Sequence, residues 1–154
     1  MKIERMTEIE TPDIQIGDRI HVDHYTATCQ KITPKGAIFL LDQYLDKAFP
    51  MNWANTNKGG YPESDLRKAL QSDEVPQWIE SDSNEQWPLM TDAHNRTASR
   101  CGDPEWGWLA NTVRDTSTVF CRVNYGGSAN RWGASSVFGV RPVFQIAADG
   151  GDKR

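Results

Sequence analysis

Alternation of apolar and polar positions in the first third of the chain predicts short strands. Residues 14–22 alternate about a Gly-Asp turn and end in a strand, and residues 25–32 continue the alternation with β-branched threonines. A Pro-Lys-Gly turn at 34–36 leads into the apolar run 37–41, which has the length of a short buried strand. Because short turns join these segments, we expect them to form an antiparallel meander.

Helical spacing of apolar residues is confined to the middle of the chain. A Pro-Glu-Ser-Asp start at 62–65 precedes Leu66, Ala69 and Leu70, which fall on one helical face. Residues 73–79 predict a second short helix. The segment that leads into the first helix is rich in Asn and Gly, and we expect it to be a loop.

The second half of the chain has a different amino-acid composition. Between residues 91 and 136, Asn, Ser, Thr, Gly, Asp and Arg predominate, with aromatic residues among them, and no helical period survives. This composition indicates short strands joined by long ordered loops, a setting in which functional residues are common. Gly126-Gly127 predicts a hairpin turn. Alternation returns at 137–146, which we predict to be one closing strand.

The chain shows neither an internal repeat nor an interdomain linker. It has 154 residues, enough for one domain with a real core. We therefore predict a single domain over residues 14–148, between a charged, flexible segment 1–13 and a polar tail 149–154. Strands in the first half, two short helices and a loop-rich second half make the expected fold class α+β.

The composition of the chain bears on membrane insertion and on cellular location. The longest apolar run, residues 37–41, is far shorter than the ~20 residues of a membrane-spanning helix, so we expect no membrane insertion. The first ten residues contain no apolar stretch after their basic residues, so we expect no secretory signal. We expect a soluble protein that is cytoplasmic as synthesised. Export by another route and assembly into a virion stay open.

The charge of the chain argues against nucleic acid as a partner. The formal net charge is −4 and the sequence pI is about 5.3. Phosphate-backbone binding requires a basic surface, and the arginines of the second half are spread thinly along the sequence.

Few residues are candidates for catalysis, disulfide formation or metal binding. Cys29, Cys101 and Cys121 form no CxxC pair, so we expect buried free thiols, with a bridge between the last two as the alternative. His21 and His24 lie three apart on a predicted strand and should face opposite sides, which disfavours a shared metal. We expect no cofactor and no zinc, while calcium held by distant loops stays open.

Six tryptophans are unusual for a chain of this size. They are Trp53, Trp78, Trp87, Trp106, Trp108 and Trp132. Large amphipathic rings are favoured binding anchors when they are partly exposed. Trp108 precedes an apolar residue and is expected in the core, whereas Trp106 and Trp132 are flanked by polar residues or Gly and are the surface candidates.

Ordered motifs of this chain resemble those of a known family. Residues 60–70, GYPESDLRKAL, resemble the G-W-x-x-S-D-[LI]-R-x-x-L segment of a large uncharacterised domain family of gut bacteria and phages. Residues 139–144, GVRPVF, resemble its closing G-V-R-P-[AV] signature. Between them, residues 106–110, WGWLA, are similar to its W-W-L-R-S motif without the arginine, and the early Ile-Gly-Asp at 16–18 fits its usual opening.

That family is similar to proteins of C-type-lectin-like fold, including formylglycine-generating-enzyme-like domains, and to the variable proteins of diversity-generating retroelements. The resemblance implies a C-type-lectin-like fold whose segment before the closing strand, here 111–138, displays diversified side chains for binding. Its richness in Asn, Ser, Tyr and Arg suits such a surface. The candidate ligand-binding residues are Trp106, Arg114, Asp115, Asn124, Tyr125, Asn130, Arg131, Trp132 and Ser135.

Other residues of the matched motifs are expected to serve the fold. Ser64 and Asp65 should cap the first helix. Arg67 and Arg141 are expected to be structural charges. Arg141 lies in an apolar strand and needs either a carboxylate such as Asp65 or a set of loop carbonyls as its partner.

Together these features predict a non-catalytic domain that binds a protein or a glycan through loops within residues 104–138. One alternative is a structural or decoration module of a virion or surface assembly, with tryptophans packed in oligomer interfaces. The other is an enzyme that uses Cys101 with His94. The oligomeric state, including a homo-oligomer, stays open.

Overall fold

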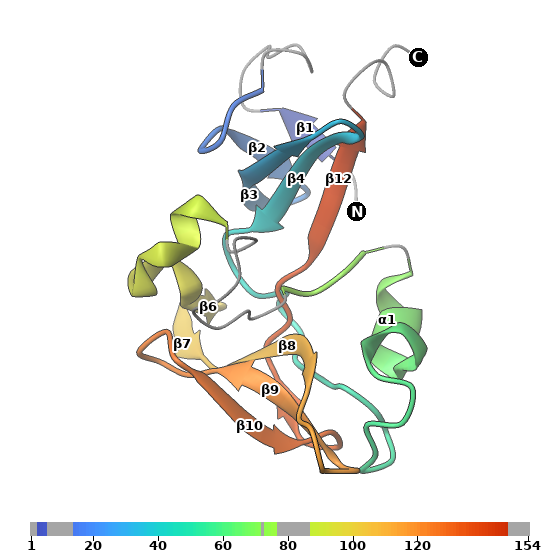
Figure 1. Ribbon diagram of the computed structural model, residues 1–154. Coiled ribbons are helices and arrows are strands. Elements are labelled where there is room, and N and C mark those ends of the chain that lie inside the picture. The colour runs from blue at the N-terminus through green and yellow to red at the C-terminus, as the bar shows by residue number, and fades with distance from the viewer. Residues whose placement is uncertain (1–2, 6–13, 72, 77–86, 148–154) are drawn as a thin grey trace.

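The computed structural model describes residues 3–5, 14–71, 73–76 and 87–147, and antiparallel strands dominate them (Figure 1). The strands are β1 (Ile3–Arg5), β2 (Arg19–Val22), β3 (Tyr25–Thr33), β4 (Gly36–Leu41), β5 (Phe49–Pro50), β6 (Ala98–Arg100), β7 (Asp103–Glu105), β8 (Gly107–Thr112), β9 (Val119–Val123), β10 (Ala129–Gly133), β11 (Val137–Phe138) and β12 (Val143–Ala147). They form a five-stranded sheet in the order β1-β2-β3-β4-β12, a three-stranded sheet β10-β9-β8, and the pairs β11-β5 and β6-β7.

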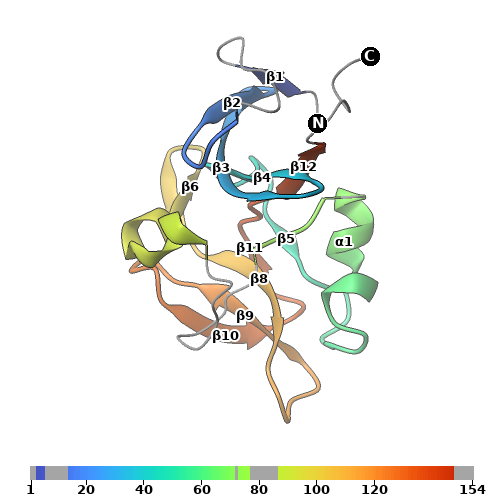
Figure 2. The same ribbon diagram turned by 45° about the horizontal axis from the view of Figure 1, so that its top comes forward.

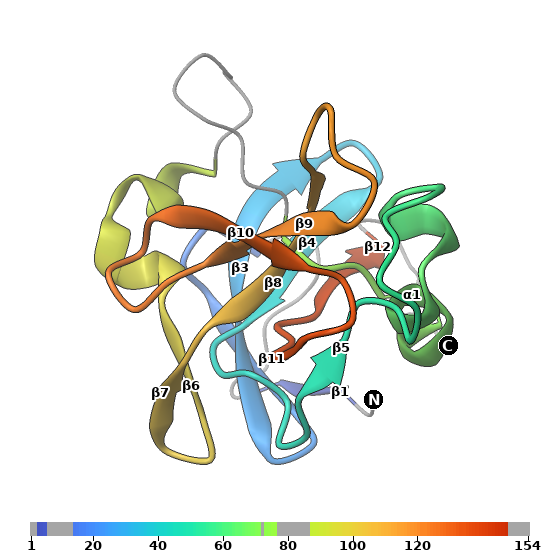
Figure 3. The ribbon, with the colours of Figure 1, turned by 90° about the horizontal axis from the view of Figure 1, so that it is seen from below.

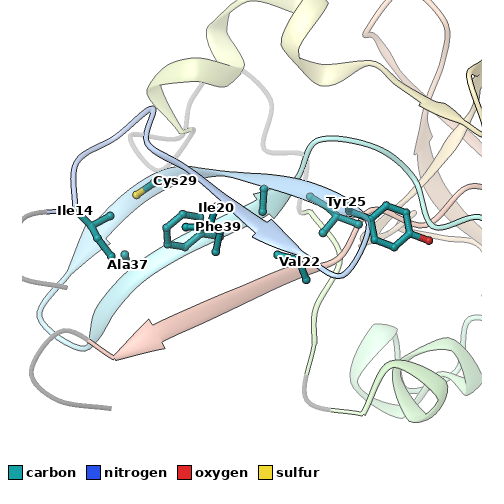
Figure 4. Close-up of a cluster of buried hydrophobic side chains, with 9 residues drawn as sticks. Ile14, Ile20, Val22, Tyr25, Cys29, Ala37 and Phe39 are labelled. Atoms are coloured by element: carbon teal, nitrogen blue, oxygen red, sulfur yellow. The ribbon is translucent and has the colours of Figure 1, made fainter. Parts of the chain in front are cut away.

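The five-stranded sheet confirms the predicted meander. β2, β3 and β4 pair antiparallel in sequence order, and β3 shifts its register between Cys29 and Lys31. The sheet curls over its own apolar side chains (Figure 2). Figure 4 shows Ile20 and Val22 from β2, Cys29 from β3 and Phe39 from β4 inside this cluster. Alternation therefore marks the buried face of these strands.

The second layer contains the three-stranded sheet, seen from below in Figure 3. Its core is more aromatic than that of the first layer: Trp108 and Phe120 pack with Tyr61, Met51 and other buried residues. Leu45 packs against both core clusters and so connects the two layers.

The predicted closing strand over 137–146 is wrong as a single strand. β11 pairs with β5, whereas β12 pairs with β4 in the five-stranded sheet. Gly139 lies between them and exchanges backbone hydrogen bonds with two residues of the second layer, Trp106 and Trp108. A side chain at Gly139 would collide with the ring of Tyr44, 2.6 Å from its Cβ position. The chain thus passes from one layer to the other at this glycine.

One of the two predicted helices is present. α1 spans Asp65–Leu70, after a 3-10 turn at Tyr61–Glu63, and the Ser64 side chain accepts a hydrogen bond from the Arg67 amide at 3.0 Å. The Asp65 carboxylate accepts from the Trp53 amide instead. The capping role of Ser64 is confirmed.

The second helix, predicted at 73–79, is wrong in its described part. Glu74 bridges to β12: its amide donates to the Val143 carbonyl at 2.9 Å, and the Val143 amide donates back at 2.7 Å. This pairing satisfies the backbone groups that a helix would have used. Residues 77–79 lie outside the described residues. With two further 3-10 turns at Pro88–Thr91 and Ala93–Arg96, the fold is mainly β rather than α+β.

The ends of the chain are described only in part. Ile3–Arg5, which were expected to be flexible, form β1 and pair with β2. The rest of the 1–13 segment and the 149–154 tail lie outside the described residues. In the part of the chain that the structure describes, no helix is long and apolar enough to cross a membrane.

Cys29, Cys101 and Cys121 form no disulfide among the described residues, so the Cys101–Cys121 bridge is absent. Cys29 is buried, Cys121 is half-buried and Cys101 is exposed. The expectation of burial therefore holds for Cys29 and is wrong for Cys101, which lies in the turn between β6 and β7.

Candidate binding face

Arg122 lies at the centre of a group of aromatic rings. It sits on β9, where it is opposite Trp108 of β8 and Asn130 of β10. Its guanidinium carbon lies 3.5 Å from the ring centroid of Trp106, 4.4 Å from that of Trp132 and 4.5 Å from that of Phe138. All three distances fall within the range of cation–π attraction.

The rings are the main compensation for the charge of Arg122. The residue is buried, its Nε has no hydrogen-bond partner, and no ion pair of Arg122 occurs within the described residues. Burial lowers the pKa of Arg122, and Tyr125 raises it. A buried cation without a carboxylate is costly unless polarisable groups surround it. The negative faces of the rings therefore hold Arg122 in place, and its planar guanidinium in turn fixes the rings.

Edge and stacking contacts extend this group from the core to the surface. Trp108 in the core meets Phe138 at 4.8 Å in a T-shaped contact, and its Nε1 donates to the Phe49 carbonyl at 2.8 Å. Phe138 stacks on Trp106, which meets Tyr125 edge-on at 5.4 Å. Each contact has the geometry that aromatic pairs prefer.

The outer members of the group are open to solvent. The exposed fraction is 60% for Tyr125 and 51% for Trp132, and Trp106 is half-buried. We call these three residues, with Phe138 and the central Arg122, the aromatic face. Contiguous apolar exposure of this kind marks interaction sites.

The structure thus brings together Trp106, Tyr125 and Trp132 of the predicted site residues. Asn130 shares a strand face with Trp132, because residues two apart in a strand point the same way. Arg131 is exposed but points to the other face of β10. Asn130 Oδ1 accepts a hydrogen bond from the Arg131 amide at 2.6 Å.

The remaining predicted residues lie elsewhere or stabilise loops. Arg114 and Asp115 are exposed in the connection between β8 and β9, at the end of β9 opposite to Tyr125. Asn124 Oδ1 accepts from the amides of Gly126 and Ser128 and so closes the predicted Gly126-Gly127 turn, which is confirmed. Ser135 is exposed after β10, and its amide donates to Asn55 Oδ1.

Sequence reasoning missed Arg122 and Phe138. One signal was available: Arg122 lies two residues from Phe120, so alternation places it on the same side of the strand as a core ring. The contact with Trp106, by contrast, depends on the register between strands.

The suggested pair of Cys101 and His94 is not assembled in the described residues. Cys101 Sγ lies 3.7 Å from the Asp46 carbonyl oxygen and 3.8 Å from Asp46 Oδ1. Asp46 Oδ2 contacts His24 Nε2 at 2.7 Å. The Asp46 carboxylate therefore lies between the Cys101 thiol and the His24 imidazole. Nucleophilic catalysis needs the base in contact with the sulfur. Among the described residues, no group of three or more His, Cys, Asp or Glu could hold a metal.

Comparison of the chain with known proteins gives no relative. No family model, no curated protein and no solved structure matches it.

Proposed function

We propose that this chain is a non-catalytic recognition domain that binds a protein partner through the aromatic face. The observation that carries the proposal is the arrangement of Trp106, Tyr125 and Trp132 around Arg122, with Tyr125 and Trp132 more than half exposed. Exposed rings fixed in one orientation lose little conformational entropy on binding. Such rings commonly act as the anchors of protein interfaces.

The hydrogen bonding around the rings favours a protein over a glycan. Sugar recognition requires free polar groups beside the rings to bind hydroxyls. Here the side-chain oxygens of Asn124 and Asn130 already accept backbone amides, and the charge of Arg122 is covered by rings. A centre of exposed rings that is poor in free charge matches the composition of a protein-interface core.

The proposal includes the finer fold and class implied by the sequence motifs. In a C-type-lectin-like domain of the retroelement variable type, the segment before the closing strand carries the binding side chains. Tyr125, Trp132 and Phe138 all belong to residues 111–138, and Phe138 lies in the first of the two closing strands. This position supports the assignment of that segment as the binding surface.

The test is a comparison of three baits. Wild-type protein, the double variant Y125A/W132A and the control W53A are immobilised, and candidate proteins are captured from the native host. Trp53 is 80% exposed and belongs to none of the ring contacts of the aromatic face, so W53A removes an exposed ring from a different surface. The affinity of each bait for the purified partner is then measured. We expect W53A to match the wild type, and Y125A/W132A to weaken binding by about 2 kcal/mol or more, or roughly thirtyfold.

Other outcomes contradict the proposal in distinct ways. Binding of the wild type and W53A, but not of Y125A/W132A, to a glycan array would make the ligand a sugar. Self-association in sedimentation velocity that is lost in the same variant would favour the structural module of an assembly. Equal capture by all three baits would exclude the aromatic face as the binding surface.

A further inference from the structure

A cavity of about 370 Å³ lies between the two layers, apart from the aromatic face. Its walls come from β3, β4 and β12 of the five-stranded sheet, from β8 and β9 of the three-stranded sheet, and from the segments around Tyr61, Glu74 and Met90. Apart from Trp108 of the core, its lining shares no ring with the Arg122 group. The volume falls within the range of small-molecule sites.

Positive charge predominates on the polar part of the wall. Among the described residues that line the cavity, Lys31, Arg96 and Arg141 are basic and one, Glu74, is acidic. Glu74 Oε1 lies 3.5 Å from the Arg67 Nε, so its charge is partly offset from outside the cavity. An anionic ligand would therefore be favoured over a cationic one.

Arg141 is the cation that most needs a partner. It is buried, its Nε donates to the Leu41 carbonyl at 2.6 Å, and its Nη1 donates to the Asn95 carbonyl at 3.0 Å. The carbonyl option among the two predicted for Arg141 is thus correct. These carbonyls satisfy hydrogen bonds but leave the charge uncompensated, and no ion pair of Arg141 occurs in the described part of the chain. Burial lowers the pKa of Arg141.

Asp42, the acidic residue whose charge acts on Arg141, is already engaged. Asp42 influences the charge of Arg141, but its two oxygens accept hydrogen bonds from Thr26 and Thr28, and one also contacts Arg19 at 3.7 Å. Leaving a buried cation without an anion is expensive, and an acidic group of a ligand in the cavity would remove that cost.

The rest of the wall is apolar and aromatic. Trp108, Leu109 and Val123 line it from the three-stranded sheet, and Tyr44 and Tyr61 line it from the side. Tyr44 is buried, and its hydroxyl has no hydrogen-bond partner among the described residues. The cavity thus combines a large apolar surface with a small number of polar groups, as ligand sites do.

We infer that this cavity binds a small organic anion that joins an aromatic or aliphatic body to one acidic group. The acidic group faces Arg141 and Lys31, and the body packs against Trp108 and Leu109. This site is separate from the aromatic face, and neither proposal depends on the other.

The probe is a pair of molecules with the same rings. 1-Anilinonaphthalene-8-sulfonate carries one sulfonate, and N-phenyl-1-naphthylamine is the same body without it. Fluorescence titration and thermal unfolding of the full chain with each probe measure affinity and stabilisation. We expect the sulfonate to bind one site about tenfold more tightly than the neutral probe, the effect of one good charge-assisted contact, and to raise the unfolding temperature.

Matched variants locate the binding. K31E reverses an exposed lysine of the cavity rim and should weaken sulfonate binding severalfold without affecting the neutral probe. K35E makes the same charge change in the adjacent β3–β4 turn, outside the cavity, and should bind like the wild type. A110F places a ring in the cavity and should abolish binding of both probes. Y125A/W132A should leave sulfonate binding unchanged.

Three results would overturn the inference. The first is equal affinity for the two probes in the wild type. The second is sulfonate binding that K31E and K35E weaken equally, since general charge would then explain it. The third is loss of sulfonate binding in Y125A/W132A but not in A110F, which would move the probe to the aromatic face. Circular dichroism of each variant separates these results from unfolding.

Discussion

The five-stranded sheet buries mainly aliphatic and small side chains, whereas the three-stranded sheet buries tryptophan and phenylalanine beside an arginine. In the first, Ile20, Val22 and Ala27 belong to a cluster with Phe39, and the strands that carry them follow one another in sequence. In the second, Arg122 is enclosed by rings from three separate segments, around residues 106, 132 and 138.

This difference separates a scaffold from a binding surface within one small β protein. Local pairing of short strands provides a scaffold that needs no special chemistry. Rings around a cation have specific geometry and so hold neighbouring exposed rings in fixed orientations. The region with unusual packing is also the region that offers a binding surface.

The strongest test asks whether the two layers unfold together. Phe39 has no exposed surface and stacks on Phe144, so F39A should lower the free energy of unfolding by about 3–5 kcal/mol. The five described tryptophans lie outside β1–β4 and β12, and Trp106, Trp108 and Trp132 lie in the second layer, so tryptophan fluorescence reports mainly on that layer. Because Leu45 packs against both clusters, we expect F39A to shift the urea midpoints of fluorescence and far-UV circular dichroism equally.

An unchanged fluorescence midpoint in F39A would mean that the layers unfold independently and that the chain is not one cooperative domain. I32A is the control for this experiment. Ile32 is 47% exposed on β3, so its truncation should cost less than about 1 kcal/mol.

The scaffold could be predicted from the sequence because its signals are local. Alternation in β2 and β3 and the turn before β4 mark both the strands and the buried face. The closing segment shows the limit of that method. Its alternation continues across Gly139, yet β11 and β12 belong to different sheets, and only the tertiary pairing reveals the change of partner. The prediction of a helix at 73–79 is wrong for the same reason. The bridge between Glu74 and Val143 overrides the helical propensity of that segment.

The candidate site was predictable by residue type but not by arrangement. Trp106, Tyr125 and Trp132 stand out as rings among polar neighbours. Arg122 does not, because a lone arginine is normally exposed. Its burial follows from the β8-β9-β10 register, which places it opposite Trp108 and Asn130. Asn124 was assigned to binding by composition, although its side chain is used to close a turn.

A second experiment separates the charge of Arg122 from its volume. R122A removes both and leaves a hole among Trp106, Trp132 and Phe138, so it should cost about 2–3 kcal/mol of unfolding free energy. R122M keeps most of the volume without a buried charge and should stay within about 1 kcal/mol of the wild type.

R131A is the matched control, because Arg131 is exposed on the other face of β10 and should change stability by less than about 0.5 kcal/mol. Urea unfolding of R122A, R122M and R131A measures the change in unfolding free energy of each variant. A loss in R122M as large as that in R122A would show that the cation–π contacts, rather than filled volume, stabilise this layer.

The smallest effect depends on pH and comes mainly from a thiol of the scaffold. Burial raises the pKa of the Cys29 thiol from 9.0 to about 11. The unfolded thiol therefore loses its proton at lower pH than the folded one, and stability that is full below pH 9 falls as pH rises toward 11. Between pH 9 and pH 10 the loss from Cys29 should be about 1 kcal/mol, and C29A should remove that part of the slope. Burial also raises the pKa of Tyr44 from 10.0 to about 12, and it raises the pKa of Tyr61 in the second layer. Both tyrosines add a loss that lies mostly above pH 10 and that C29A leaves in place. A slope between pH 9 and pH 10 that is as steep in C29A as in the wild type would show that Cys29 is not the group responsible.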